Sequence, residues 1–158
     1  MDREALDIEM IAEIMQFGNG MAVEYFLDRE TGEVFGIPEE VFVAIENEEE
    51  DSLRPSQRSL AERARTIYTG STRFVPVPHL TESDLYLVIS DLCTKMDDPE
   101  AAEAVAVVLA SDDFIGRFEE LCLAQPDIFD LFNELMDAYT QRVMSTWLVE
   151  VGFVISRR

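Results

Sequence analysis

The chain has 158 residues, of which 47% are hydrophobic, and its 33 Asp and Glu residues against 12 Lys and Arg give a formal net charge of −21. This apolar fraction excludes the class of chains that stay disordered for lack of buried apolar surface, and the length predicts a single domain over residues 1–158. The negative charge argues against direct binding to nucleic acid or to an anionic membrane, because both need Lys and Arg to neutralise phosphates.

The first fifth of the chain predicts a helix followed by a hairpin. Residues 3–17 carry apolar side chains at steps of three and four, the spacing of an amphipathic helix. Two stretches rich in β-branched and aromatic residues follow, 22–28 and 33–35, with Gly32 between them. Because Gly32 can supply the positive φ of a short turn, a small antiparallel β-hairpin is expected near residues 21–36. The alternating side chains expected to face the core are Val23, Tyr25 and Leu27.

The segment after the hairpin mixes helical and extended patterns. Pro38 followed by two glutamates is typical of the first turn of a helix. A further helix is predicted over residues 56–68, where Ser59-x-x-Glu62 has the spacing of a capping box. Residues 74–78 read Phe-Val-Pro-Val-Pro and are expected to be extended, because each proline restrains the residue before it.

The second half, residues 81–153, is predicted to be helical. Thr81-Glu-Ser-Asp84 has the spacing of a capping box ahead of an apolar stripe, and later helices are expected to begin at Asp98-Pro99, at Ser111-Asp-Asp113 and at Gln125-Pro126. Together the elements predict an α+β fold, mainly α, with about six to seven helices around one core and the small hairpin.

Sequence features also predict where the protein resides. The start of the chain lacks a basic and apolar leader, and the longest apolar run, residues 104–110, is too short to cross a bilayer. Cys93 and Cys122 are too few and too widely spaced for a disulfide framework or a zinc site, so both are expected to be reduced core residues. The expected location is the cytoplasm.

Several segments together resemble a known family. They are Tyr25-Phe-Leu-Asp-Arg-Glu-Thr-Gly-Glu-Val34, Phe74-Val-Pro-Val-Pro78, Phe114-Ile-Gly-Arg-Phe118, Ala138-Tyr139 and Trp147-Leu-x-x-x-Gly152. In this order they resemble a bacterial family of uncharacterised proteins, the one numbered zero-one-five-eight in its series. The resemblance implies a small, mainly helical cytosolic domain and no established activity, cofactor or catalytic residue. This chain has fewer basic residues near Arg117 and in its last helix than the family often carries, which weakens the case for a shared anion site there.

Candidates for catalysis and for metal binding are few. His79, the only histidine, lies in a loop between Pro78 and the Thr81 cap, where a general base could act. No nucleophile elbow, phosphate loop or zinc motif accompanies it, so an ordinary loop residue is the simpler interpretation. The acids of the last helix at steps of three, four and three fit a solvated polar face better than a metal site; they are Asp127, Asp130, Glu134 and Asp137. No catalytic residue, metal site or cofactor is therefore expected, although an enzyme remains open.

The charges are segregated along the chain. Residues 54–80 hold five arginines and one carboxylate, whereas the segments on both sides are strongly acidic. One interpretation is an anion-binding site; its candidate residues are Arg58, Arg65, Arg73 and His79. The other is an internal counter-charge that pairs with the acids of residues 48–51 or of the first and last helices. The second is favoured, because the surrounding negative field attracts these arginines and repels an external anion.

The hairpin offers a different kind of candidate site. Phe26 and Phe35 would form a protein interface if no helix covers them, and the free edge of the hairpin could pair with a second copy to make a homodimer. The alternative is that helices cover both faces of the hairpin.

These observations lead to two hypotheses about function. The first is a non-catalytic protein-interaction or regulatory module whose acidic surface binds a protein partner, for which a basic protein would be complementary in charge. The alternative is a small enzyme or ligand-binding protein that uses the Arg54–Arg73 segment and His79 on an anionic substrate. They differ in whether these arginines converge on one open pocket or each contact a carboxylate of the chain itself.

Overall fold

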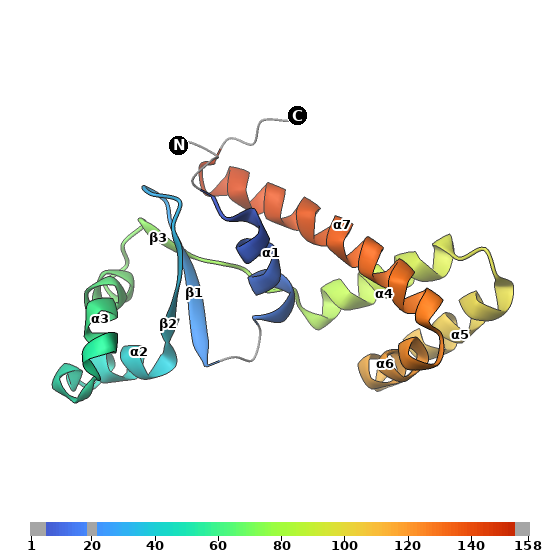
Figure 1. Ribbon diagram of the computed structural model, residues 1–158, viewed down its shortest axis with the longest axis horizontal. Helices are drawn as coiled ribbons and strands as arrows, with labels where there is room; N and C mark the ends of the chain where they lie inside the picture. Colours follow the sequence, from blue (N-terminus) through green and yellow to red (C-terminus); the bar gives the residue numbers. More distant parts are fainter. Residues whose placement is uncertain (1–5, 19–21, 154–158) are drawn as a thin grey trace. The chain divides into compact units, whose positions relative to one another are not determined.

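The computed structural model describes residues 6–18 and 22–153. Within them the chain has seven α-helices and three strands, so the mainly α, α+β fold is confirmed (Figure 1). In order, the elements are α1 (Ile8–Phe17), β1 (Val23–Asp28), β2 (Val34–Pro38), α2 (Glu39–Glu46), a 3-10 turn (Glu50–Ser52), α3 (Pro55–Tyr68), β3 (Phe74–Pro76), α4 (Glu82–Lys95), α5 (Pro99–Leu109), α6 (Phe114–Ala124) and α7 (Pro126–Glu150).

The chain divides into two compact units. Unit 1 holds the described residues up to His79 and those from Met144 onward, and unit 2 is Leu80–Val143. Each unit has a hydrophobic cluster of its own. The sequence predicted one core, whereas the described residues form at least two clusters. The prediction of one domain over residues 1–158 stays a prediction.

Unit 1 is built on a small antiparallel sheet with the strand order β2-β1-β3. The predicted hairpin forms β1 and β2, and Gly32 has the expected positive φ, 79°. The segment predicted to be extended supplies β3, which pairs with β1 on the side away from β2. β1 is therefore the central strand, and the free edges of the sheet belong to β2 and β3.

Both faces of the sheet are covered near the end of β1. Phe26 and Leu27 point to opposite faces, and only 3% and 0% of their surfaces are exposed. Phe26 packs with residues of β2, α2 and α3, whereas Tyr25 on the opposite face borders a hollow that α1 also lines. Alternation correctly separated the two faces, but the expectation that only the Val23–Leu27 face meets the core is wrong, because helices pack on both.

α3 begins where its first proline places it. Pro55 occupies the first turn, where its missing N–H costs no hydrogen bond, and the Gln57 side chain accepts a hydrogen bond from the backbone N–H of Arg54 at 3.3 Å. Ser59 lies inside the helix, where its hydroxyl donates to the carbonyl oxygen of Ser56. The predicted capping box Ser59-x-x-Glu62 is therefore wrong, although the helix itself is confirmed.

Unit 2 consists of α4, α5, α6 and the first part of α7. The predicted caps are confirmed: Thr81, Asp98 and Asp113 each accept a hydrogen bond from a backbone N–H in the first turn that follows. The helices enclose a cluster in which Ile89, Leu92 and Val105 are fully buried. Cys93 and Cys122 are free and partly buried beside this cluster.

Candidate functional site

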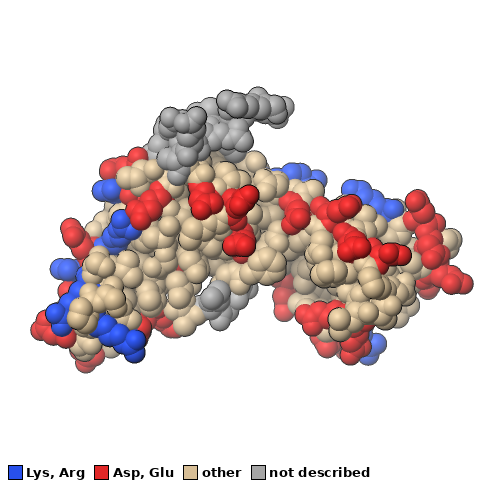
Figure 2. All heavy atoms as spheres, viewed as in Figure 1, with Lys and Arg blue, Asp and Glu red and all other residues tan. Residues whose placement is uncertain are grey.

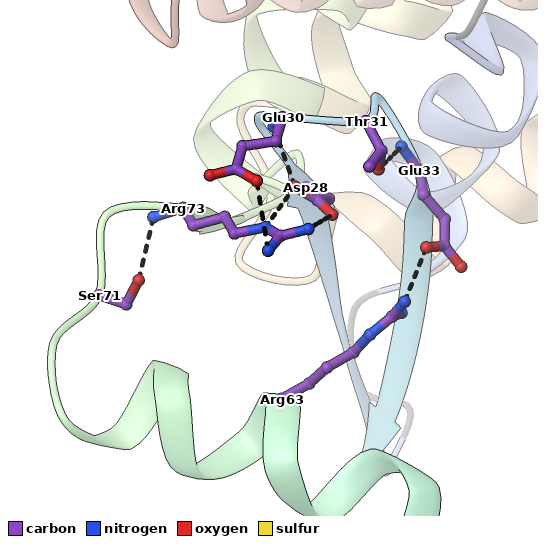
Figure 3. A network of polar contacts seen from close by, with 7 residues as sticks. All are labelled: Asp28, Glu30, Thr31, Glu33, Arg63, Ser71 and Arg73. Carbon is purple, nitrogen blue, oxygen red and sulfur yellow. Dashed lines mark hydrogen bonds and ion pairs between the residues drawn. The ribbon is translucent and has the colours of Figure 1, made fainter.

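Among the described residues of unit 1, the most buried charged side chain is a carboxylate at the end of β1. Asp28 is only 1% exposed, and both of its oxygens accept hydrogen bonds from Arg73, at 3.0 Å from Nε and 2.9 Å from Nη2 (Figure 3). The backbone N–H of Glu30 donates to the same carboxylate at 2.9 Å. The Arg73 side chain, followed by this N–H, lowers the pKa of Asp28 from 3.8 to about 2, although burial acts in the opposite direction.

Arg73 is held in place by more than this one contact. Its Nη1 lies 3.3 Å from a carboxylate oxygen of Glu30 (Figure 3). Its guanidinium lies over the ring of Phe74, 5.1 Å from the centroid. The neighbouring Asp28 raises the pKa of Arg73. This arginine therefore joins β3 to the hairpin turn, and its positive charge is paired with the carboxylates of Asp28 and Glu30.

Two further arginines of the segment also pair with carboxylates of the chain. Arg63 donates to Glu33 at 2.8 Å (Figure 3). Its guanidinium also lies over the ring of Phe35, 4.4 Å from the centroid. Arg65 lies 3.3 Å from a carboxylate oxygen of Glu50 in the 3-10 turn. Glu50 belongs to the acidic run in which the sequence predicted a counter-charge, whereas Glu33 on the hairpin was not anticipated.

The remaining candidates contact main-chain oxygens. Arg58 donates to the carbonyl oxygens of Leu53 at 3.3 Å and Asp51 at 3.4 Å, so it supplies hydrogen bonds to the main chain ahead of α3. His79 Nδ1 lies 3.1 Å from the carbonyl oxygen of Ile14 and so donates to the last turn of α1.

The four predicted anion-binding side chains thus lie at three different places. Arg58 and Arg65 meet at the 3-10 turn, Arg73 is at the hairpin turn, and His79 contacts α1. The contacts agree with the counter-charge interpretation, since Arg65 and Arg73 each bind a carboxylate of the chain. Anion binding by these residues has only their sequence pattern to support it and stays a prediction.

The two aromatic residues proposed as an interface are part of the core. Phe26 is 3% exposed and Phe35 is 7% exposed, and their rings stack at 6.0 Å. Val41 and Ala44 of α2 and Ala64 of α3 belong to the same cluster. An interface through these rings does not agree with their burial, and the alternative in which helices cover this face describes them correctly. Pairing of two copies along a hairpin edge stays a prediction.

An open groove lies in unit 1 among α2, the 3-10 turn and the start of α3. Its volume is about 630 Å³. Apolar side chains and carboxylates line it together: Ala22, Pro38, Glu39, Glu40, Val43, Ala44, Glu49, Ser52, Leu53, Arg54 and Gln57. Sequence reasoning missed this groove, because no local signal in the acidic run of residues 47–52 shows that it returns to the side of α2.

Unit 2 carries most of the excess negative charge. Residues 80–143 contain 15 Asp and Glu against three Lys and Arg, a net charge of −12. Figure 2 shows acidic side chains predominating over the helices of unit 2 on the face in view, whereas basic ones gather around α3. The sequence anticipated this distribution, since it follows from the charge segregation along the chain.

A hydrogen bond between side chains in unit 2 joins α4 to α7. Tyr139 on α7 donates to Asp84 on α4 at 2.5 Å, while the other oxygen of Asp84 accepts from the backbone N–H of Thr81 at 2.7 Å. Burial opposes ionisation of Asp84, but the hydrogen bonds from Tyr139 and Thr81 outweigh it and lower the pKa of this carboxyl. The same contact raises the pKa of Tyr139. Asp84 therefore caps the start of α4 and also joins this helix to α7.

In residues 6–18 and 22–153, no three His, Cys, Asp or Glu side chains are grouped so that they could hold a metal ion. Across the same part of the chain, every helix is too short or too polar to cross a bilayer.

Comparisons with known proteins add no relative. No family model matches the chain, and neither a curated protein nor a solved structure matches it. The resemblance to the uncharacterised family therefore stays a prediction that rests on its sequence segments.

Proposed function

We propose that the protein is a non-catalytic interaction or regulatory module that binds a basic protein partner through its acidic surface. The observation that carries the proposal is the charge that the chain cannot neutralise itself. With 33 carboxylates and 12 cationic side chains, 21 carboxylates remain in excess even if every Lys and Arg forms an ion pair. Such a field attracts a cationic surface and speeds its approach.

The described contacts support this choice over the enzyme hypothesis. The guanidinium groups of Arg65 and Arg73 are occupied by carboxylates of the chain, and His79 is bound to a carbonyl oxygen. An anionic substrate at Arg73 would have to displace a buried carboxylate that makes two hydrogen bonds with it. The expected partner is therefore a positively charged protein. We also propose that the protein is cytoplasmic and belongs to the uncharacterised family that its sequence resembles.

The test is the salt dependence of partner binding. The immobilised protein is exposed to an extract of its own cells at about 50 mM NaCl, where charges are screened little, and retained proteins are identified. A second column of poly-glutamate removes proteins that bind any polyanion. For a purified partner, the dissociation constant is expected to rise steeply between about 50 and 300 mM NaCl. A partner whose affinity does not change over this range would refute the electrostatic basis of the proposal.

A further inference from the structure

The groove beside α2 combines an apolar lining with an open mouth. Leu53 and Ala44 are buried in its wall, only 6% and 5% exposed, whereas Val43 is 46% exposed and leaves a branched apolar side chain facing water. A small apolar ligand binds in a cavity that encloses most of its surface. An open groove of about 630 Å³ with exposed apolar surface instead suits a short segment of a protein chain.

The charges that line the groove favour a segment with a positive net charge. Glu39, Glu40 and Glu49 line it against the single cation Arg54, which leaves a net charge of −2. Glu40 accepts a hydrogen bond from the Gln57 amide. Within residues 6–18 and 22–153, neither Glu39 nor Glu49 has an ion-pair partner, so both carboxylates are available to an incoming cation.

We infer that this groove receives a short segment of the protein partner in which apolar residues alternate with Lys or Arg. The inference rests on the proposed function and names the part of the acidic surface that makes the close contact. Apolar side chains of the segment cover Val43 and the wall formed by Ala44 and Leu53, and its cations pair with Glu39 and Glu49. Desolvated apolar contacts supply the affinity, while the surrounding charge sets the approach rate.

The test uses a fluorescein-labelled decapeptide of alternating leucine and arginine, measured by fluorescence anisotropy. Two control peptides replace either arginine with glutamate or leucine with serine. The groove variants are Val43→Lys and the pair Glu39→Gln with Glu49→Gln. Their matched controls in unit 2 change the net charge equally at exposed helical positions: Val107→Lys and the pair Glu103→Gln with Glu120→Gln. Circular dichroism checks that every variant is folded.

Each groove variant is expected to weaken binding of the leucine–arginine peptide about tenfold, the equivalent of about 1.4 kcal/mol, while the unit 2 controls stay within about twofold. Both control peptides should bind at least about tenfold more weakly than the leucine–arginine peptide, because each lacks one of the two contacts.

The contrary outcomes separate the two proposals. Equal losses in the groove variants and in their unit 2 controls would mean diffuse attraction by the whole surface, which refutes the groove and leaves the proposed function standing. Absence of peptide binding at about 50 mM NaCl would refute the inference that the groove binds such a segment. The salt dependence of binding by the captured partner would still test the proposed function independently. Self-association that Val43→Lys abolishes, seen by sedimentation velocity, would replace the partner segment with a second copy of the chain.

Discussion

The Asp28–Arg73 pair shows how one buried carboxylate depends on a distant residue. Asp28 is nearly inaccessible, whereas the Arg73 side chain is 41% exposed, so the two groups depend on their contact unequally. If Asp28 is removed, the guanidinium can turn to water. If Arg73 is removed, a buried carboxylate loses two hydrogen bonds and keeps the one from the backbone N–H of Glu30, which is the costlier change.

The pair predicts a stability difference that depends on pH. Because the pKa of Asp28 is lowered from 3.8 to about 2 in the folded protein, its ionised form contributes about 2 kcal/mol to the free energy of unfolding. This contribution is fully present above pH 4 and is lost as the pH falls through about 2. Asp28→Asn should therefore lower the free energy of unfolding by about 2 kcal/mol at pH 7 and by little near pH 2, measured by urea denaturation.

Arg73→Met is expected to cost more than Asp28→Asn at pH 7 for the reason given above. The matched controls are Asp51→Asn and Arg54→Met, which change the charge equally at exposed positions of the same unit. A cost of Asp28→Asn that is the same at pH 7 and at pH 2.5 would show that the carboxylate charge is not the source of the stability.

Among the elements of unit 2, α4 and α7 are joined at the start of α4 by a hydrogen bond between Asp84 and Tyr139. Asp84 caps α4 with one carboxylate oxygen and binds Tyr139 of α7 with the other. Loss of the tyrosine hydroxyl leaves a partly buried carboxylate with fewer donors, which raises its pKa and weakens the attachment of α7.

Tyr139→Phe is accordingly expected to lower the free energy of unfolding by about 1–2 kcal/mol, since the hydrogen bond involves a charged group. In the variant, the pKa of Asp84, followed by NMR titration, should rise toward its ordinary value. Tyr86→Phe is the control, because Tyr86 lies on α4, the helix that carries Asp84, and is 44% exposed. An unchanged pKa of Asp84 would contradict the role given to the hydroxyl.

The elements differ in how far the sequence could predict them. The helix starts at Thr81, Asp98 and Asp113 were correct, because a cap is a contact within one turn and its signal is local. The Ser59 cap was wrong because Pro55 already starts the helix one turn earlier.

Contacts between distant residues escaped prediction. Asp28 and Arg73 are 45 residues apart, and nothing in the local sequence names either as the partner of the other. Burial of Phe26 was left as one of two alternatives for a related reason: alternation divides a strand into two faces, but it does not say that α2 and α3 pack on the second one. The groove depends on the return of residues 47–52 to α2 and could not be read from composition.

The whole molecule carries a net charge that opposes its own folding. Unit 2 has a net charge of −12 in 64 residues, and the described ion pairs of unit 1 consume only part of its acids. Like charges held together in a compact state repel one another more than they do in the expanded unfolded chain. Stability must therefore come from apolar packing and caps that outweigh this repulsion, and screening the repulsion should be favourable.

The thermal midpoint is thus expected to rise when NaCl increases from about 20 to 500 mM, because the screening length falls from about 20 Å to below 5 Å. A gain of about 1 kcal/mol corresponds to roughly 2–4 °C for a chain of this size, measurable by circular dichroism. A variant with Glu103→Gln, Glu120→Gln and Asp130→Asn, all exposed in unit 2, should start from a higher midpoint and gain less from salt. If salt instead lowers the midpoint, attractive ion pairs such as Asp28–Arg73 outweigh the repulsion between carboxylates. The excess carboxylates would then not produce the net negative potential that the proposed partner binding requires.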